Sequence, residues 1–391
     1  MKTTYLLLCL LGIGSVSGAG QTKQPQKIGD FIESTSYNEH RRNATRSLQY
    51  TPDGDDFVCI NGKNRFTRAL YGSHTAFRLE TSDRPVFAAY TKENPKHICF
   101  KLQTSGGTVA LDSTEHCESR YTAGRRSYSL SDPAFGGGSL SITTWALPDK
   151  EGAIWQFNAR NFKEFHPVLL ASISEIRNSK LNRNGDMGAD PADSFEAPLQ
   201  PQQLQSFPVQ IDGTLYMLLE NQELRTLTTA EGENLFKKAE AARSETASRI
   251  RIETPDPYFN TLGGTLAMAA DGIWDGEVWL HGAIGWRMPL SGWRAAYTGD
   301  VLGWHDRART HFNAYAASQV TEVPNTLPHP AQDSALHLAR SVKKWGTPQY
   351  SNGYICRNPH RNNQMHHYDM NLCYIDELLW HFKWTGDLDY V

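Results

Sequence analysis

The pattern of apolar residues changes near residue 230, and this change constrains the fold more than any other feature. From Phe57 to Leu219 the chain has short runs of alternating apolar and polar residues, such as Ile98 to Leu102 and Leu140 to Trp145. Alternation with a period of two is typical of strands, and no helical segments separate the runs. The sequence therefore predicts an antiparallel β-sandwich over residues 28–230, with a hairpin turn at Asn61-Gly62.

Residues 231–254 have a helical spacing of apolar side chains. The side chains that fall near one face of such a helix are Leu235, Ala239, Ala242 and Ile250. The sequence Thr254-Pro255-Asp256-Pro257 stops the pattern, because a residue before proline is biased away from the helical conformation. We expect a linker helix that joins two domains.

Residues 255–391 have the pattern of helices joined by long loops. Three groups of apolar residues recur at helical spacing: Trp304, Ala308, Phe312 and Tyr315; Leu338, Val342 and Trp345; and Leu372, Ile375, Leu379 and Phe382. The predicted fold class is thus multidomain β + α, with a sandwich, a linker helix and a helical domain.

Two stretches of the sandwich region are rich in turn-forming residues. Asn182 to Pro191 resembles a calcium loop only in its Asn and Asp spacing, and it lacks the terminal bidentate Glu. A solvated excursion is the preferred interpretation, and a loop that reaches toward a neighbouring domain is the alternative. Pro198 to Pro208 is rich in Gln and Pro, which indicates a surface excursion or a linker.

The N-terminus has the features of a secretory signal peptide. Lys2 precedes an apolar run from Tyr5 to Val16, and Ser17-Gly18-Ala19 offers small residues for cleavage after Ala19. We expect residues 1–19 to be removed and the protein to be secreted or periplasmic; a short buried helix is the alternative. The run is too short for a membrane span, and no other long apolar run follows.

Composition excludes two broad classes of protein. The net charge of −3 argues against a dedicated nucleic-acid-binding protein, which normally carries a basic surface. Hydrophobic residues make up 39% of the chain and aromatic residues 11%, which is enough to build cores and excludes global disorder.

A short motif occurs twice in the helical region. Tyr297-Thr298-Gly299-Asp300 is repeated as Trp384-Thr385-Gly386-Asp387. We interpret each copy as a tight reversal in which Gly ends one helix and Asp caps the next, so that helical hairpins form an array. Minimal turns at one end of an array leave the long loops, residues 272–289 and 346–365, at the other end, where sites usually lie.

The first long loop combines aromatic and polar side chains that suit a carbohydrate. Trp faces pack against the C–H faces of sugar rings, while Arg, His and Asp bind hydroxyl groups. The candidate substrate-binding residues here are Trp274, His281, Trp286, Arg287, Trp293 and Arg294. The alternative is that Trp279, Trp286 and Trp293, spaced by seven, form a core stripe.

Asp275 and Glu277 are the candidate acid and base of the same loop. A glycosidase needs one carboxyl group to protonate the leaving oxygen and a second as base or nucleophile. The alternative is that one of them caps a helix or pairs with Arg287 or Arg294.

The second long loop and the helix after it add further polar candidates. These are His366, His367 and Asp369, with His360 before them. Substrate hydrogen bonding is favoured over a metal, because adjacent histidines on a helix do not point at one ion and the HExxH motif is absent. The sequence has neither a phosphate-binding glycine loop nor a GxSxG elbow, so no cofactor is expected.

Taken together, these features resemble the six-hairpin glycosidases, which have an (α/α)6 toroid, often behind an N-terminal β-sandwich. The resemblance rests on the sandwich, the linker helix, the Thr254-Pro255-Asp256-Pro257 entry and the repeated Thr-Gly-Asp motif. The region Arg46 to Gly72 is similar to an uncharacterised family of such proteins from gut Bacteroidetes. Toroid polysaccharide lyases usually carry the sandwich after the toroid, so the order here resembles that of the glycosidases.

The resemblance implies a glycoside hydrolase that acts on a poly- or oligosaccharide. Residues 258–391 hold only about four helices, far fewer than six hairpins need. We therefore expect the chain to be the front part of a longer enzyme, inactive alone, with exposed apolar helix faces and with the general acid beyond Val391. The alternatives are a non-catalytic carbohydrate-binding protein and a toroid polysaccharide lyase.

Overall fold

The computed structural model describes most of the chain from residue 50 onward. The described residues are 50–63, 66–90, 96–162, 167–175, 204–208, 213–282, 288–289, 296–319, 321, 332–333, 338–339, 353–360 and 368–391. The chain divides into residues 1–49 and residues 50–391, and every described residue belongs to the second unit. The predicted signal peptide and the loop from Asn182 to Pro191 lie outside the described residues. Within the described part, no helix is both long and apolar enough to cross a membrane.

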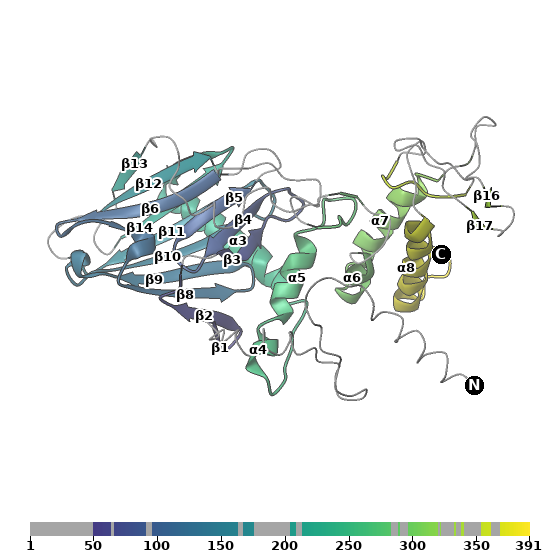
Figure 1. Cartoon of the computed structure of the whole chain (residues 1–391), viewed down its shortest axis with the longest axis horizontal. Coiled ribbons are helices and arrows are strands. Elements are labelled where there is room, and N and C mark those ends of the chain that lie inside the picture. Colours follow the sequence, from purple (N-terminus) through teal and green to yellow (C-terminus); the bar gives the residue numbers. More distant parts are fainter. Residues whose placement is uncertain are drawn as a thin grey trace, which may run out of the picture. The chain divides into compact units, whose positions relative to one another are not determined.

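Eight antiparallel strands form the first sheet, in the order β1-β2-β8-β9-β10-β11-β14-β15 (Figure 1). Their bounds are β1 Thr51–Asp53, β2 Asp56–Ile60, β8 His116–Thr122, β9 Arg125–Ser131, β10 Ser139–Ala146, β11 Gly152–Arg160, β14 Thr214–Glu220 and β15 Glu223–Leu227. Consecutive strands are mostly neighbours, as expected where tight turns join antiparallel strands.

The second sheet has seven antiparallel strands, in the order β13-β12-β6-β5-β4-β3, with β7 also paired to β6. Their bounds are β3 Phe66–Tyr71, β4 Arg78–Ser82, β5 Val86–Tyr90, β6 Lys96–Thr104, β7 Gly107–Ala110, β12 Val168–Glu175 and β13 Leu204–Pro208. The interpretation of Pro198 to Pro208 as a surface excursion or linker was therefore wrong for its second half. Leu204–Pro208 forms an edge strand, because pairing with β12 outweighs its weak local strand signal.

The core lies between the inner faces of the two sheets. Trp155 of β11 contacts Phe87 of β5 and Phe100 of β6, at ring-centroid distances of 5.5 and 6.0 Å. Phe157, two residues after Trp155, also faces Phe100, at 5.0 Å. Side chains two apart on one strand share a face, so the alternating pattern of the sequence forms this core directly. The two antiparallel sheets of the prediction are confirmed. The predicted hairpin at Asn61-Gly62 is wrong, because β2 and β3, the strands on either side of it, belong to different sheets and do not pair.

Helix α3 (Thr229–Ala247) covers the outer face of the first sheet. It begins with a capping box in which Thr228 and Glu231 bond each other's backbone N–H groups, a signal visible in the sequence as Thr-x-x-Glu. A Cβ on Gly232 would lie 2.1 Å from the ring of Tyr216, so glycine here allows the helix to approach the sheet. The helix ends at Ala247, earlier than the predicted 254, and Ile250 follows it.

A partly buried ionic network holds α3 against the sheet. The carboxylate of Glu240 accepts hydrogen bonds from Trp145 Nε1 at 2.8 Å and from Arg243 Nε at 2.9 Å. Arg243 also donates to the backbone carbonyl of Ala123 at 2.9 Å, in the turn between β8 and β9. Arg125 of β9 adds a further bond to Glu240, at 3.3 Å.

Two short helices follow, α4 (Pro257–Asn260) and α5 (Gly263–Asp271), and glycines bring α5 close to the sandwich. Gly124, in the left-handed region at φ +81°, leaves room for the side chain of Met268, whose Cε would lie 2.7 Å from an added Cβ. A Cβ on Gly264 would lie 2.9 Å from that of Ala123. The β8–β9 turn therefore contacts α5 as well as α3.

The remaining helices are α6 (Ala296–Val301), α7 (His305–Ala316) and α8 (Tyr368–Thr385), and each contacts the other two. The predicted face of α7 is confirmed as buried. Its members Trp304, Ala308, Phe312 and Tyr315 are all at most 6% exposed. The described elements thus form a mixed β plus α fold.

The two copies of the Thr-Gly-Asp motif have different structures. At the second copy, Gly386 ends α8 at φ +69°, and Asp387 Oδ1 accepts the N–H of Tyr390, as predicted. At the first copy the prediction was wrong, because Gly299 lies inside α6 and Gly303, at φ +73°, makes the turn before α7. Packing decides this difference: a Cβ at Gly299 would lie 2.3 Å from the ring of Trp279.

The third predicted apolar face faces solvent. On α8, Leu372, Ile375 and Leu379 are 69%, 55% and 47% exposed. This agrees with the expectation of exposed apolar helix faces. Leu338, predicted to be helical, belongs instead to the short strand β17 (Leu338–Ala339), which pairs with β16 (Gln332–Asp333). Val342 and Trp345 lie outside the described residues.

Candidate functional site

The candidate site is built on a tight loop after α5, over residues 274–279. Backbone pairing of Trp274 with Trp279 closes the loop, and Gly276 at φ +101° makes its turn. Oδ1 of Asp275 accepts the N–H groups of Glu277 at 3.0 Å and Val278 at 2.8 Å. The Asp275 carboxylate therefore acts as the internal cap of the loop and fixes Glu277 at its tip.

Glu277 pairs with His360, which comes from a segment 83 residues further along the chain. The carboxylate contacts Nε2 of the imidazole, and the two side chains are 49% and 54% exposed. His360 has a left-handed backbone at φ +57°, and its N–H donates to the carbonyl of Ala314 on α7 at 3.2 Å. The pair is thus fixed through its backbone while its side chains remain open to a ligand.

The side chains of Trp279, His311 and Tyr315 are buried and pack against one another where this loop ends. Nδ1 of His311 accepts the backbone N–H of Trp279 at 3.1 Å, so Nε2 carries the ring proton. Burial lowers the pKa of His311 to about 3, which keeps the ring neutral. Burial raises the pKa of the Tyr315 hydroxyl, and the Asp275 carboxylate raises it further.

These three side chains also have polar atoms without partners. Trp279 Nε1, His311 Nε2 and the Tyr315 hydroxyl are buried and have no hydrogen-bond acceptor within the described part of the chain. The rings of His311 and Tyr315 lie 4.9 Å apart, and those of Trp279 and His311 lie 5.8 Å apart. Such donors need an acceptor, and a water molecule or a ligand oxygen can supply one.

The ends of two candidate-rich segments adjoin the loop. Leu280 pairs with Pro289, and the N–H of His281 donates to the carbonyl of Met288 at 2.9 Å. Arg357 contacts the sulfur of Met288 at 3.2 Å. His360, which contacts Glu277, is the last described residue before α8.

The structure positions only some of the residues that the sequence suggested. Trp274 is 3% exposed and packs on Trp279 at 4.7 Å, so its ring supports the loop and cannot stack on a sugar. His281 is partly buried, and Asp369 is exposed in the first turn of α8. The candidates outside the described residues are Trp286, Arg287, Trp293, Arg294, His366 and His367.

His311 was not among the residues predicted from the sequence. It lies on the buried face of α7, three residues after Ala308 and one before Phe312. A polar residue at an apolar position of a helical pattern was the available signal. Its hydrogen bond to Trp279 could not be predicted, because 32 residues separate the two partners.

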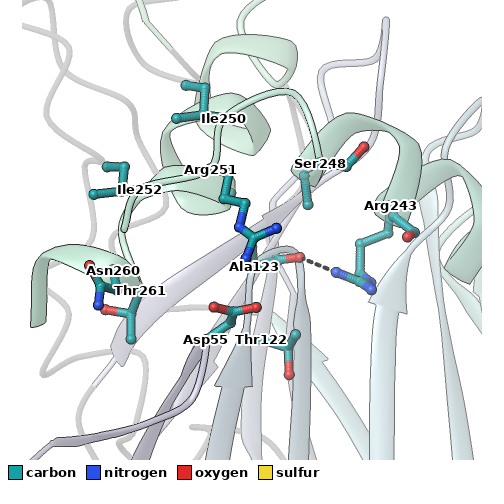
Figure 2. A pocket seen from close by; sticks show the side chains of 13 residues that line it. Asp55, Thr122, Ala123, Arg243, Ser248, Ile250, Arg251, Ile252, Asn260 and Thr261 are labelled. Atoms are coloured by element: carbon teal, nitrogen blue, oxygen red, sulfur yellow. Dashed lines mark hydrogen bonds between the residues drawn. The ribbon is translucent and has the colours of Figure 1, made fainter. Parts of the chain in front are cut away.

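A separate cleft of about 490 Å³ lies where the β1–β2 turn, the β8–β9 turn, the end of α3 and the α4–α5 segment meet. Figure 2 shows Asp55 and Arg251 pointing into it from opposite sides. Hydroxyl and amide groups line much of the rest: Thr122, Ser244, Ser248, Asn260 and Thr261. The cleft therefore combines polar and apolar groups, and charged groups of both signs line it.

Residues 95–250 match the model of a protein family described as a domain of unknown function, DUF4450. No curated protein matches the chain. The matched segment is about two fifths of the chain, and it contains most of the sandwich strands together with α3. The DUF4450 match thus covers part of the cleft, including Thr122 and Ser248, and ends before the Glu277 loop.

Proposed function

We propose that the chain contributes to a glycoside hydrolase, in which Glu277 is one of the two carboxyl groups of the reaction. The observation that carries this proposal is the half-exposed Glu277–His360 pair at the tip of a fixed loop. Hydrolysis of a glycosidic bond requires a carboxyl group that can give or take a proton while it reaches the substrate oxygen. A side chain that is open to solvent and held by its backbone satisfies the geometric part of that requirement.

Asp275 has a positioning role in this proposal. Its Oδ1 already accepts two backbone N–H groups, so protonation of the carboxylate would weaken the loop that holds Glu277. The second carboxyl group of the reaction is therefore left to another part of the protein. The toroid arrangement suggested by the sequence belongs to the same proposal, and α6, α7 and α8 are its helical elements.

The surroundings of Glu277 suit a carbohydrate. Residues 283–287 contain Trp286 and Arg287, and residues 361–367 contain His366 and His367. We propose that these side chains stack on the sugar or bind its hydroxyl groups, which are the two kinds of contact that a carbohydrate needs.

The test compares Glu277→Gln with the parent in the longest product that the reading frame encodes. A panel of polysaccharides is assayed for new reducing ends. We expect Glu277→Gln to lower kcat at least about 100-fold while substrate retention in affinity gels is kept. Glu233→Gln, an exposed substitution on α3, is the matched control and should leave kcat unchanged.

Two results would contradict the hydrolase proposal. Hydrolysis that stays within twofold of the parent in Glu277→Gln would remove this carboxylate from the reaction. An unsaturated product that absorbs in the ultraviolet would show elimination, and the protein would then be a lyase.

A second candidate function is non-catalytic carbohydrate binding at the cleft. Its mixed lining, with hydroxyl, amide and charged groups beside apolar ones such as Ile250 and Ile252, is the observation that favours it. Ser248→Trp would fill the cleft beside α3. If the cleft binds the sugar, this variant loses retention in an affinity gel, whereas Glu277→Gln keeps it.

A further inference from the structure

Three side chains from three helices converge away from the Glu277 loop. Asp300 is in α6, His305 is the first residue of α7, and His381 is in the second half of α8. Nδ1 of His305 lies 2.7 Å from Asp300 Oδ1. Nδ1 of His381 lies 2.8 Å from the same oxygen and 2.9 Å from Oδ2.

The backbone around Asp300 explains this convergence. Gly303, at φ +73°, turns the chain sharply after α6. Its N–H donates to the carbonyl of Asp300 at 3.0 Å, and that of Trp304 donates to the carbonyl of Gly299 at 2.8 Å. The turn therefore returns His305 to the carboxylate five residues before it, and α8 brings His381 from the other side.

Burial makes the three groups unequal. The side chain of His381 is fully buried and that of Asp300 is 5% exposed, whereas His305 is 42% exposed. Two ligand groups are thus fixed in the protein, and the third stands at the solvent boundary. This arrangement leaves a path by which a small ion can enter.

We propose that Asp300, His305 and His381 form a site for a divalent first-row transition ion of the Zn²⁺ type. Two imidazoles and one carboxylate are donors that such ions prefer, and the single negative charge suits a divalent cation. The three ligand atoms all lie within 4.8 Å of one another. Three protein ligands with a water as the fourth complete a tetrahedral shell.

The distances show what binding would require. Metal–ligand bonds of about 2.0–2.1 Å in a tetrahedral site place neighbouring ligand atoms about 3.3 Å apart. The present separations of 2.7 to 2.9 Å are hydrogen-bond distances, so the ligand atoms would move apart by about half an ångström. His305, which is 42% exposed, can move away from Asp300 at the surface, and Asp300 and His381 must separate by a similar amount inside the protein.

The neighbouring charge does not oppose a cation. Arg309 of α7 is engaged by the carboxylate of Asp387, at 2.7 Å. Its guanidinium lies over the ring of Tyr390, and that ring contacts His381 at 5.4 Å. Arg309 therefore does not neutralise the carboxylate of Asp300. A bound ion would link the α6–α7 turn to α8 and stabilise that arrangement.

The experiment uses the full chain after treatment with a chelator and dialysis. Zn²⁺ and Co²⁺ are titrated by calorimetry, and the visible absorption of Co²⁺ reports low-symmetry nitrogen and oxygen coordination. We expect one equivalent of either ion and a rise in the Tm of the chain on binding. His305→Ala should weaken the binding at least about tenfold.

Two variants keep the proposal falsifiable. His305 is partly exposed, so His305→Ala should fold, and its circular dichroism spectrum checks that. His116→Ala removes an exposed imidazole from the sandwich and should leave the affinity unchanged. No binding by the parent chain, or an equal affinity in His305→Ala, would overturn the site.

Discussion

The ring of Trp279 packs directly against the backbone of Gly299, where an added Cβ would lie 2.3 Å from the indole. Trp279 is fully buried in the core of the helical region, together with Trp274 and Phe312. Glycine inside a helix is normally a weakness, since alanine is better there by about 1 kcal/mol. Here the lack of a side chain allows α6 to approach the candidate loop.

Gly299→Ala should therefore destabilise the protein even though it improves helix propensity. Overpacking of a filled core costs about 1–3 kcal/mol, and a methyl group against a fixed indole falls in the upper part of that range. We expect a net loss of about 1–2 kcal/mol in the free energy of unfolding, measured by denaturant titration. A gain in stability would show that the ring of Trp279 moves away freely.

His311 should make the protein sensitive to mild acid. Burial lowers the pKa of the folded ring to about 3, whereas the unfolded chain titrates near 6.5. Between these values only the unfolded state binds the proton, so stability is present above pH 6.5 and decreases as the pH falls. His311 alone should remove about 1.5 kcal/mol between pH 6.5 and about pH 5.

The matched variant is His311→Asn, whose amide oxygen can still accept the N–H of Trp279. Unfolding free energies of both proteins are measured across this pH range. The gap between parent and variant should shrink toward acid. A gap that stays constant would mean that the folded ring also takes up a proton.

Arg243 should contribute more to stability than an exposed ion pair on the same helix. It holds Glu240 by bonds of 2.6 and 2.9 Å and also bonds Ala123, and its side chain is 11% exposed. Arg243→Ala leaves Glu240 partly unpaired, which we expect to cost about 2–3 kcal/mol. Lys238→Ala breaks an exposed pair with Asp149 and should cost under about 0.5 kcal/mol. Denaturant titration of both variants measures the difference, and equal losses would contradict it.

The same network gives a second pH signature. Burial alone would raise the pKa of Glu240, but the hydrogen bond and the charge of Arg243 outweigh it and lower the pKa below 4.5. This contribution is present above pH 4.5 and is lost as the pH falls through the folded value. Glu240→Gln should therefore differ from the parent most at neutral pH, and the difference should shrink as the pH falls below 4.5, by thermal denaturation. An undiminished difference in acid would contradict this.

The exposed apolar face of α8 should limit solubility. Replacing Leu372, Ile375 and Leu379 together with Gln removes apolar surface that makes few contacts, so the unfolding free energy should change little. The variant should stay monomeric at concentrations where the parent associates, measured by light scattering after size exclusion. Met370→Gln, at a buried position of the same helix, should destabilise the chain by about 2 kcal/mol.

Much of the sandwich was predictable because residues that face the two sides of a strand alternate along the sequence. Trp155 and Phe157 lie two residues apart on one face, and that pattern holds wherever the partner strand comes from. The buried face of α7 was predictable for the same reason, at helical spacing. Strand β13 and the end of α3 were not, since pairing and packing partners decide them.

The candidate site was predictable in its residue types and not in its geometry. The sequence indicated Asp275 and Glu277 as a candidate acid and base, with a capping role or an ion pair as the alternative for one of them. In the structure, Asp275 accepts hydrogen bonds from two backbone N–H groups, and the Glu277 carboxylate contacts the imidazole of His360. The bonds of Asp275 are local, whereas the contact of Glu277 with His360 spans 83 residues, and no local pattern records it.

The sequence by itself determined the order of a β-rich part, a joining helix and a helical part, because strand and helix periodicities are local properties of the chain. Only the tertiary structure decided why two identical Thr-Gly-Asp triplets differ. Gly386 ends a helix, while Gly299 lies within one against Trp279. Asp387 bonds Arg309, and Asp300 holds two imidazoles. Short motifs permit several conformations of similar energy, and the contacts of distant residues select among them.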